Sequence, residues 1–320
     1  AATVGGNLAA TATAGNMTDN GALAITGTTT LTTSANNATI ALDTTTNAFT
    51  GAVTITTNDD SGANADVTID GGTTALILAA STIDGDLTVR SGNASGIIDN
   101  GLVTVGGNLA ATTDDNSGVI NLGTLAVDGT VALTTHGSGN ATVVNDNGLT
   151  FAAATVGGNL AATATAGNMT DNGALAITGT TTLTTSANNA TIALDTTTNA
   201  FTGAVTITTN DDSGANADVT IDGGTTALIL AASTIDGDLT VRSGHASGIT
   251  DNGLVTVGGN LAATTDAAHG VINLGTLAVD GTIALATNGS GNATVVNDAG
   301  LNFAASTVGG VLNATATTGN

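Results

Sequence analysis

The sequence is dominated by an internal repeat. Residues 1–152 recur as residues 153–304, and 142 of the 152 aligned positions are identical, about 93%. Residues 305–320 then repeat residues 1–16 with a few changes, so the chain looks like a window on a longer array. We therefore expect two near-identical solenoid units, 1–152 and 153–304, and the start of a third at 305–320, within one continuous solenoid.

A weaker period lies inside each 152-residue unit. An apolar residue, a small or polar residue and a glycine precede an alternating apolar stretch in segments that begin at Val4, Ile25, Phe49, Ile69, Ile83, Val105 and Val127. Asp or Asn recurs after an apolar pair at Asp43, Asp99, Asn121 and Asn145, and after Met-Thr at Asp19 and Asp171. These landmarks lie 22 to 26 residues apart, except for a gap of 56 after Asp43, where we expect a further turn near Asp70. The spacing predicts six rungs of about 25 residues per unit and about 12–13 rungs in the chain.

The short segments alternate as β-strands do. Val53 and Ile55 alternate with Thr54 and Thr56, which predicts apolar side chains pointing inward and Thr pointing outward. Clusters of Gly, Asn, Asp and Ser separate the segments and supply turns. An antiparallel sandwich does not explain a chain that repeats itself without a boundary. We predict an all-β fold, a right-handed parallel β-helix (β-solenoid), with rungs about 4.8 Å apart and a rod roughly 60 Å long.

The composition agrees with this fold. The chain contains no Lys, Glu or Gln, which favour solvent-facing helices, whereas Thr, Val, Ile, Asn and Gly are abundant. It also contains no Pro, which would remove a backbone hydrogen-bond donor from every rung that it entered. Backbone pairing on both sides of nearly every strand is therefore expected.

The segments VGGNL, ITGTTTLTT and VNDNGLTF carry a family resemblance. With the small-residue alphabet and rungs of about 20–25 residues, the chain resembles the repetitive shafts of filamentous-haemagglutinin-like adhesins and other giant bacterial surface proteins that are exported by two-partner or autotransporter routes. The resemblance covers the whole chain. It implies a bacterial, extracellular or cell-surface location and a fibrous, adhesive or matrix role, and it supplies no catalytic residues.

Charge limits the partners that we expect. All 25 acidic residues are Asp, against Arg90 and Arg242 alone, and the net charge is −23. A chain this acidic is not expected to bind nucleic acid or anionic membrane surfaces. No apolar run approaches the roughly 18 residues of a membrane helix, so membrane insertion is not expected either. The expected partners are other copies of the chain, with divalent cations or glycans as further candidates.

The sequence predicts no catalytic residues. His136, His245 and His269 each align with Asn or Ser in the other copy, whereas a catalytic triad or a histidine metal site needs a fixed constellation. Arg90 and Arg242 occupy the same repeat position, where we expect a salt bridge to a nearby Asp. β-Helical enzymes that act on polysaccharides bind sugars with aromatic and basic residues, which this chain almost wholly lacks. We therefore expect a protein that is not an enzyme and has no cofactor.

Pairs of Asp leave one metal hypothesis open. Asp59 and Asp60, and Asp84 and Asp86, place carboxylates close together, which is the oxygen-rich setting that Ca²⁺ prefers. The GGxGxDxUx repeat of Ca²⁺-binding β-rolls does not recur, so we favour Asp as a turn former and keep Ca²⁺ at these residues as the alternative. Glycosylation sequons occur at Asn16, Asn37, Asn93 and Asn140, as expected by chance in a chain rich in Asn and Thr.

Three functions follow from this reasoning. We expect first a secreted structural protein that forms an extracellular fibre, sheath or matrix filament, because a shaft gains length by duplication. The alternative is the shaft of a cell-surface adhesin whose binding domain lies outside this window. A minor alternative is an ice-binding protein with Thr ranks such as those at 26–28 and 54–56, although a flat Thr array needs rungs of equal length and the landmark spacings vary.

Overall fold

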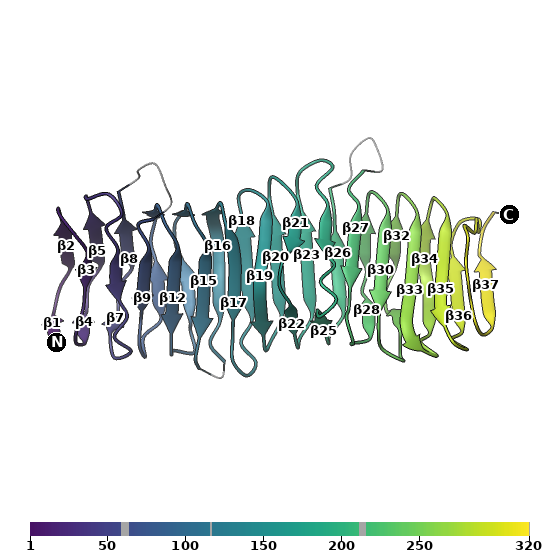
Figure 1. The fold of residues 1–320 in the computed structure, drawn as a ribbon, viewed down its shortest axis with the longest axis horizontal. Coiled ribbons are helices and arrows are strands. Elements are labelled where there is room, and N and C mark those ends of the chain that lie inside the picture. Colours follow the sequence, from purple (N-terminus) through teal and green to yellow (C-terminus); the bar gives the residue numbers. More distant parts are fainter. Residues whose placement is uncertain (59–63, 116, 211–215, 320) are drawn as a thin grey trace. The chain divides into compact units, whose positions relative to one another are not determined.

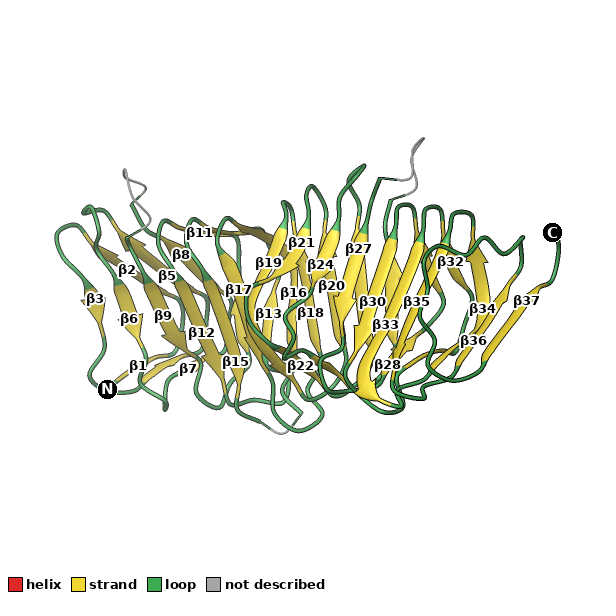
Figure 2. Ribbon diagram, turned by 45° about the vertical axis from the view of Figure 1, so that its right-hand side comes forward, coloured by secondary structure: helices red, strands yellow, loops and turns green. Residues whose placement is uncertain are grey.

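The computed structural model describes residues 1–58, 64–115, 117–210 and 216–319. Among these residues the secondary structure consists of strands and isolated bridges, and none of them is helical (Figure 2). The chain divides into two compact units, Ala1–Asn159 and Leu160–Asn320. The division lies a few residues beyond the end of the first sequence repeat at residue 152.

The first unit contains the following strands (Figure 1). They are β1 (Ala2–Val4), β2 (Leu8–Ala12), β3 (Met17–Thr18), β4 (Leu23–Ile25), β5 (Thr29–Thr33), β6 (Ile40–Leu42), β7 (Ala48–Phe49), β8 (Val53–Thr56), β9 (Val67–Asp70), β10 (Leu76–Leu78), β11 (Ser81–Ile83), β12 (Leu87–Ser91), β13 (Ile97–Asp99), β14 (Val103–Val105), β15 (Leu109–Thr113), β16 (Ile120–Val127), β17 (Thr130–Thr134), β18 (Ala141–Asn145) and β19 (Leu149–Val156).

The second unit repeats this order. Its strands are β20 (Leu160–Ala164), β21 (Met169–Asp171), β22 (Leu175–Ile177), β23 (Thr181–Thr185), β24 (Ile192–Leu194), β25 (Ala200–Phe201), β26 (Val205–Thr208), β27 (Val219–Asp222), β28 (Leu228–Leu230), β29 (Ser233–Ile235), β30 (Leu239–Ser243), β31 (Ile249–Asp251), β32 (Val255–Val257), β33 (Leu261–Ala268), β34 (Ile272–Val279), β35 (Ile283–Asn288), β36 (Ala293–Asn297) and β37 (Leu312–Ala316).

The strands of each unit form long parallel sheets. In the first unit, sheet A contains β1, β4 and β7, and sheet C contains β3, β6, β9, β12, β15, β17 and β19. Sheet B begins with β2, β5 and β8, continues as the two strands β10 and β11 and then β13 and β14, and ends with β16 and β18. Each strand pairs in parallel with the strand one turn later, as Leu87 does with Leu109 and Leu109 with Val131. The predicted all-β parallel solenoid is confirmed.

The turns are shorter and more numerous than the landmarks predicted. A turn has about 22 residues and the chain has about 14 turns, where we expected about 25 residues and about 12–13 rungs. The expectation is wrong because the landmark changes face: Asp19 and Asp43 follow sheet C strands, whereas Asp99 and Asn121 lie in sheet B strands. Between Asp43 and Asp99 the chain forms β12 on sheet C, in a turn that carries no landmark. The landmarks therefore indicate one turn too few in each repeat.

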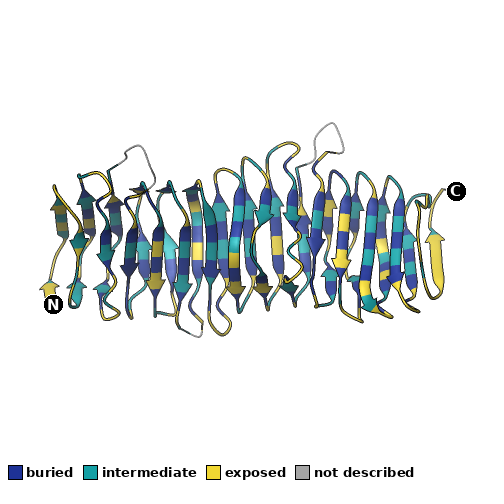
Figure 3. Ribbon diagram, in the orientation of Figure 1, coloured by how far each residue is buried: buried dark blue, intermediate teal, exposed yellow. Residues whose placement is uncertain are grey.

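The core is built from the inward positions of these strands. Val53 and Ile55 are fully buried, and Thr54 between them is partly exposed, as the alternation predicts. The same alternation runs along the strands of both units, where buried and more exposed residues follow one another (Figure 3). Phe49 and Phe151 have no exposed surface. Stacked apolar side chains therefore fill the interior of each turn.

Not every Thr points outward. Thr33, Thr113 and Thr135 are buried at the point where a strand enters a corner. Their hydroxyls donate hydrogen bonds to backbone carbonyls of the same corner, as Thr113 does to Gly118 at 2.9 Å. The expectation that Thr faces solvent is therefore wrong for these positions, because the corner carbonyls need a donor inside the molecule.

A glycine column explains the weaker sequence period. Gly85, Gly107 and Gly129 stack at the corner before sheet C, where the N–H of Gly107 donates to the carbonyl of Gly85 at 3.0 Å. A Cβ atom at Gly107 would overlap the Asp86 carboxylate, so only glycine allows the turns to approach. The segment that begins at Ile69 differs, because its Gly72 lies after sheet C, with φ of +56°.

Candidate functional site

Side chains at the corner before sheet C bind the backbone of the next turn. Oδ1 of Asp66 accepts a hydrogen bond from the N–H of Asp86 (2.9 Å), and Oδ1 of Asp86 accepts one from the N–H of Asn108 (2.7 Å). Oδ1 of Asn108 accepts from the N–H of Thr130 (2.9 Å). We call this chain of contacts the Asx ladder. In the second unit it contains Asp218, Asp238, Asn260 and Thr282, at 2.7–2.8 Å.

The candidate Ca²⁺ ligands lie at this corner. Asp86 belongs to the Asx ladder, and Oδ2 of Asp84 faces the N–H groups of Asn64 (3.2 Å) and Ala65 (3.4 Å). Each carboxylate therefore already accepts hydrogen bonds from backbone amides. Asp59 and Asp60 lie outside the described residues. Within the described ranges, no group of three or more Asp or His side chains is placed to hold a metal ion. Ca²⁺ binding stays a prediction.

The Asp landmarks also connect neighbouring turns. The carboxylate of Asp19 accepts hydrogen bonds from the hydroxyl of Thr44 (3.0 Å) and from Nδ2 of Asn47 (2.7 Å). The carboxylate of Asp99 accepts from the N–H groups of Gly123 (2.9 Å) and Thr124 (2.6 Å). Asp19 and Asp99 thus each connect their own turn to the next one.

Two buried asparagines in each repeat have a structural role that the sequence does not signal. Asn47 and Asn145 are each 1% exposed. Oδ1 of Asn47 accepts from the N–H of Leu23 (2.8 Å), and Oδ1 of Asn145 accepts from the N–H of Val127 (2.8 Å). In the sequence, Asn145 stands out only as a landmark. The sequence signal for such a residue is weak, because Asn is equally common in the exposed corners.

The two arginines form the expected salt bridges, and each one connects three successive turns. Nε and Nη2 of Arg90 donate to the two carboxylate oxygens of Asp114 at 2.8 Å each, while Nε lies 4.0 Å from Oδ2 of Asp70. The hydrogen bond to Asp114 raises the pKa of Arg90 above its ordinary value. Burial raises the pKa of Asp70 above its ordinary value, and it outweighs the hydrogen bond from the N–H of Gly72 and the charge of Arg90, which both lower this pKa. Arg242, Asp266 and Asp222 repeat this arginine clamp.

The histidines lie in exposed corners. Nδ1 of His136 lies 3.1 Å from the carbonyl oxygen of Thr113, and Nδ1 of His245 accepts from the N–H of Ser247 at 3.0 Å. His269 has a φ of +66° and lies 2.6 Å from the hydroxyl of Ser290. The structure therefore places each histidine in its own corner contact.

The sequon asparagines also lie in corners. Oδ1 of Asn16 accepts from the N–H of Thr39 (3.0 Å), and Oδ1 of Asn140 accepts from the N–H of Asn159 (2.8 Å). Oδ1 of Asn93 accepts from the N–H of Ser95 (2.9 Å). Asn37 is exposed, with a φ of +57°.

Outward Thr side chains align across the turns of sheet B. Thr30 pairs with Thr54, and Thr32 pairs with Thr56. In the next turn Thr82 pairs with Thr56. Thr26 and Thr28 of the expected TGT rank lie at a corner and not in a strand. The Thr rank at residues 54–56 thus has an aligned neighbour, and the loops at the corners absorb the unequal turn lengths.

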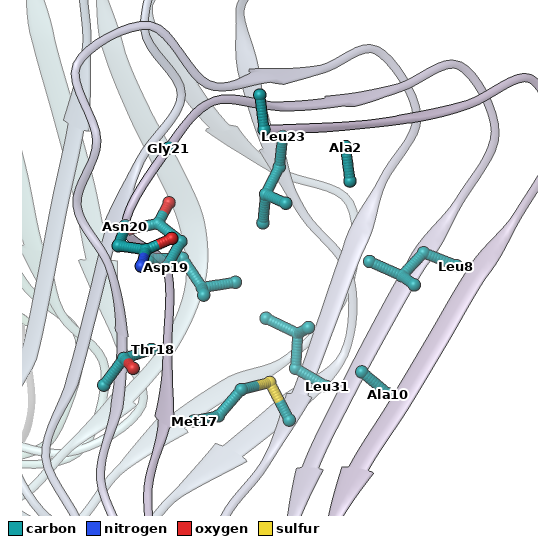
Figure 4. Close-up of a pocket in the computed structure, with 12 residues that line it drawn as sticks. Ala2, Leu8, Ala10, Met17, Thr18, Asp19, Asn20, Gly21, Leu23 and Leu31 are labelled. Carbon is teal, nitrogen blue, oxygen red and sulfur yellow. The ribbon is translucent and has the colours of Figure 1, made fainter.

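A hollow lies at the first turns of the first unit. Leu8, Met17 and Leu31 line it from the inward faces of β2, β3 and β5, and Asp19 lies at its polar side (Figure 4). Its apolar lining belongs to the same stacked core as the deeper turns. Thr18, Asp19 and Asn20 form the polar part of its lining.

The described part of the chain contains no helix that is long and apolar enough to cross a membrane. Comparison with protein families gives one match: the model of the family described as repeats of unknown function (DUF5649) matches residues 1–56, 138–208 and 216–275, more than half of the chain. No curated protein and no solved structure matches it.

Proposed function

The chain belongs to the family of repeats of unknown function (DUF5649), and from this premise we propose that it is a structural protein of an extracellular fibre, sheath or matrix filament. The proposal assigns it no catalytic step and no cofactor. Its partners in this role are further copies of the chain, and its net charge of −23 disfavours nucleic acid. The finer form of the proposal is a shaft similar to those of filamentous-haemagglutinin-like bacterial adhesins, located at the cell surface.

One observation carries this proposal: the contacts between turns recur after 152 residues with the same geometry. The ladder bond from Asn108 to Asp86 and its counterpart from Asn260 to Asp238 are both 2.7 Å long. The arginine clamps recur in the same way. A further copy of the repeat would therefore add seven turns without a new kind of contact. Because each turn touches only its neighbours, such a chain gains length at no cost to the stability of earlier turns.

Electron microscopy of the purified full chain tests the fibre. We expect filaments of uniform width in negative stain. Val53→Asp with Val205→Asp, which places a charge in the core of each unit, should abolish the filaments, whereas Thr54→Ser with Thr206→Ser should leave them unchanged. Dispersed compact particles at every protein and salt concentration would remove the fibre proposal.

A second function is favoured by the alignment of Thr on sheet B. Thr30 and Thr54, and Thr32 and Thr56, form two parallel ranks on a regular, uncharged strand surface. In the second unit, Thr182 and Thr184 pair with Thr206 and Thr208. A regular array of hydroxyl and methyl groups suits a flat ordered lattice such as ice. The unequal landmark spacing is no obstacle within these two turns, since β5 and β8 keep their register there.

Thermal hysteresis of the purified protein tests this second function. Thr54→Asp with Thr206→Asp should abolish any hysteresis, because both side chains lie within the ranks on sheet B. Thr88→Asp with Thr240→Asp is the matched control, since these exposed side chains lie on sheet C. A complete absence of hysteresis in the unmodified protein ends the ice-binding candidate.

A further inference from the structure

The third and fourth turns of each repeat meet with unusually little strand pairing on sheet B. In the first unit, β8 forms one register pair with β10 (Val53 with Leu78) and one with β11 (Thr56 with Thr82). On its other side β8 forms four register pairs with β5. The mismatch arises because one strand of the third turn faces two strands of the fourth. We call this interface the seam.

At the seam, Ser and Thr hydroxyl groups accept hydrogen bonds from backbone N–H groups in place of carbonyl oxygens. The N–H of Ile55 donates to Oγ of Ser81 (3.0 Å), and that hydroxyl donates to the carbonyl of Ala79 (2.8 Å). The N–H of Asp84 donates to Oγ1 of Thr57 (2.8 Å).

Sheet A shows the same change. Among the described residues it ends at β7, and the N–H of Phe49 donates to Oγ1 of Thr74 (3.1 Å). Side-chain bridges thus replace part of the backbone ladder between the third and fourth turns.

The second unit has the same seam. Val205 pairs with Leu230 and Thr208 pairs with Thr234, again as single register pairs. The N–H of Ile207 donates to Oγ of Ser233 at 3.0 Å. The seam is therefore a recurring feature of the repeat.

The longer contact of the arginine clamp crosses the seam on sheet C, where β9 and β12 keep four register pairs. Arg90 belongs to β12 of the fourth turn, and Asp70, 4.0 Å away, belongs to β9 of the third. Both arginines of the chain occupy this place in their repeats. The Arg90 side chain is 51% exposed, so its attraction to Asp70 and Asp114 is screened by salt.

We propose that each repeat opens first at the seam, and that the hydroxyl bridges and the arginine clamp form a salt-sensitive latch that controls this opening. Few register pairs on sheet B must break for the third and fourth turns to separate there. In a fibre, the seam provides one yielding point every 152 residues.

Hydrogen exchange of the full chain, followed by mass spectrometry in sub-denaturing urea, tests the proposal. Residues 49–57 and 201–209 have the same sequence, so one peptide reports both seams. Residues 103–113 and 255–265 are likewise identical and report turns away from the seam. We expect the seam peptide to exchange at least about tenfold faster than the reference peptide. Equal protection of the two peptides at every urea concentration would overturn the seam.

Variants test the latch. Ser81→Ala with Ser233→Ala should speed exchange of the seam peptide alone, whereas Ser34→Ala with Ser186→Ala, at exposed corners, is the matched control and should have no effect. Raising NaCl from about 0.05 M to about 0.5 M should speed seam exchange in the unmodified protein. Arg90→Gln with Arg242→Gln should remove this salt dependence. Salt dependence that survives in the Gln variant would overturn the role of the arginines.

Discussion

Two buried Thr residues on strand β5 should respond to the same substitution with opposite signs. Thr29 has no exposed surface, and its Oγ1 has no hydrogen-bond partner among the described residues. It pairs with Leu8 in the turn before and with Val53 in the turn after, so its inward neighbours are apolar. Thr33, four residues along the strand, is 2% exposed, and its hydroxyl donates to the carbonyl of Ala38 at 3.2 Å.

The expected magnitudes follow from this difference. A buried polar group without a partner costs about 1–3 kcal/mol, and Val has nearly the shape of Thr. Thr29→Val should therefore raise the free energy of unfolding by about 1–3 kcal/mol. Thr33→Val should lower it by about 1–3 kcal/mol, because the substitution leaves the Ala38 carbonyl buried without its donor.

Urea unfolding followed by far-ultraviolet circular dichroism measures both effects, since the chain has no Trp. The midpoint should rise for Thr29→Val and fall for Thr33→Val at an unchanged slope. Thr181→Val and Thr185→Val repeat the test in the second unit, where Thr181 is the counterpart of Thr29. A loss of stability in both members of a pair would refute the reasoning, because it would show that Oγ1 of Thr29 has a partner in solution.

Three further predictions concern glycine substitutions, the carboxylate of Asp70 and the bundling of chains. Gly107→Ala should destabilise the protein by several kcal/mol, because its Cβ overlaps the Asp86 carboxylate, whereas Gly123→Ala, whose Cβ has only one neighbour at 3.9 Å, should be nearly neutral in the same urea assay. The raised pKa of Asp70 means that the folded state holds this proton more tightly than the unfolded state. The stability that Asp70 contributes should therefore grow as pH falls from neutral and be complete below its ordinary pKa of 3.8. The urea midpoint of the unmodified protein should accordingly rise relative to the midpoint of Asp70→Asn as the solution becomes acidic. A relative fall of the unmodified protein's midpoint in acid would contradict this. Lateral bundling, measured by light scattering, should increase with salt because salt screens the repulsion between acidic chains. If Asp side chains bind the cation, bundling should increase more with millimolar Ca²⁺ than with Na⁺ at equal ionic strength. Identical Ca²⁺ and Na⁺ curves would mean that charge screening is the only cause.

The sequence predicts the fold class because that class depends on local pattern. Val53 and Ile55 alternate with Thr, and glycine and asparagine separate the strands, so each segment specifies a strand and a corner before any partner is known. The 152-residue repeat then requires an architecture that continues. The number of turns does not follow, because Asp43 and Asp99 look alike in sequence, but Asp43 follows a strand of sheet C whereas Asp99 lies in a strand of sheet B. The register between successive turns decides on which sheet such a residue lies.

The polar residues show the same limit. The sequence places Asp84 and Asp86 close together, and the structure confirms that they share a corner. The sequence alone does not show that each carboxylate already accepts hydrogen bonds from the backbone of another turn, because the donors lie about 20 residues away in the chain. Arg90 was expected to pair with a nearby Asp, and only the stacking of turns selects Asp114 and Asp70, from the turns on either side.

The sequence by itself determined that this protein is a repeating, all-β, acidic chain, because composition, periodicity and turn residues act over a few neighbouring residues. Only the tertiary structure decided which buried Thr hydroxyl lacks a hydrogen-bond partner and which has one, at which glycine a Cβ atom has no space, and where the seam lies. Thr29 and Thr33 are the same residue type at inward positions of one strand. They differ in whether a carbonyl of the fold comes within reach, and that distance is set by how successive turns stack.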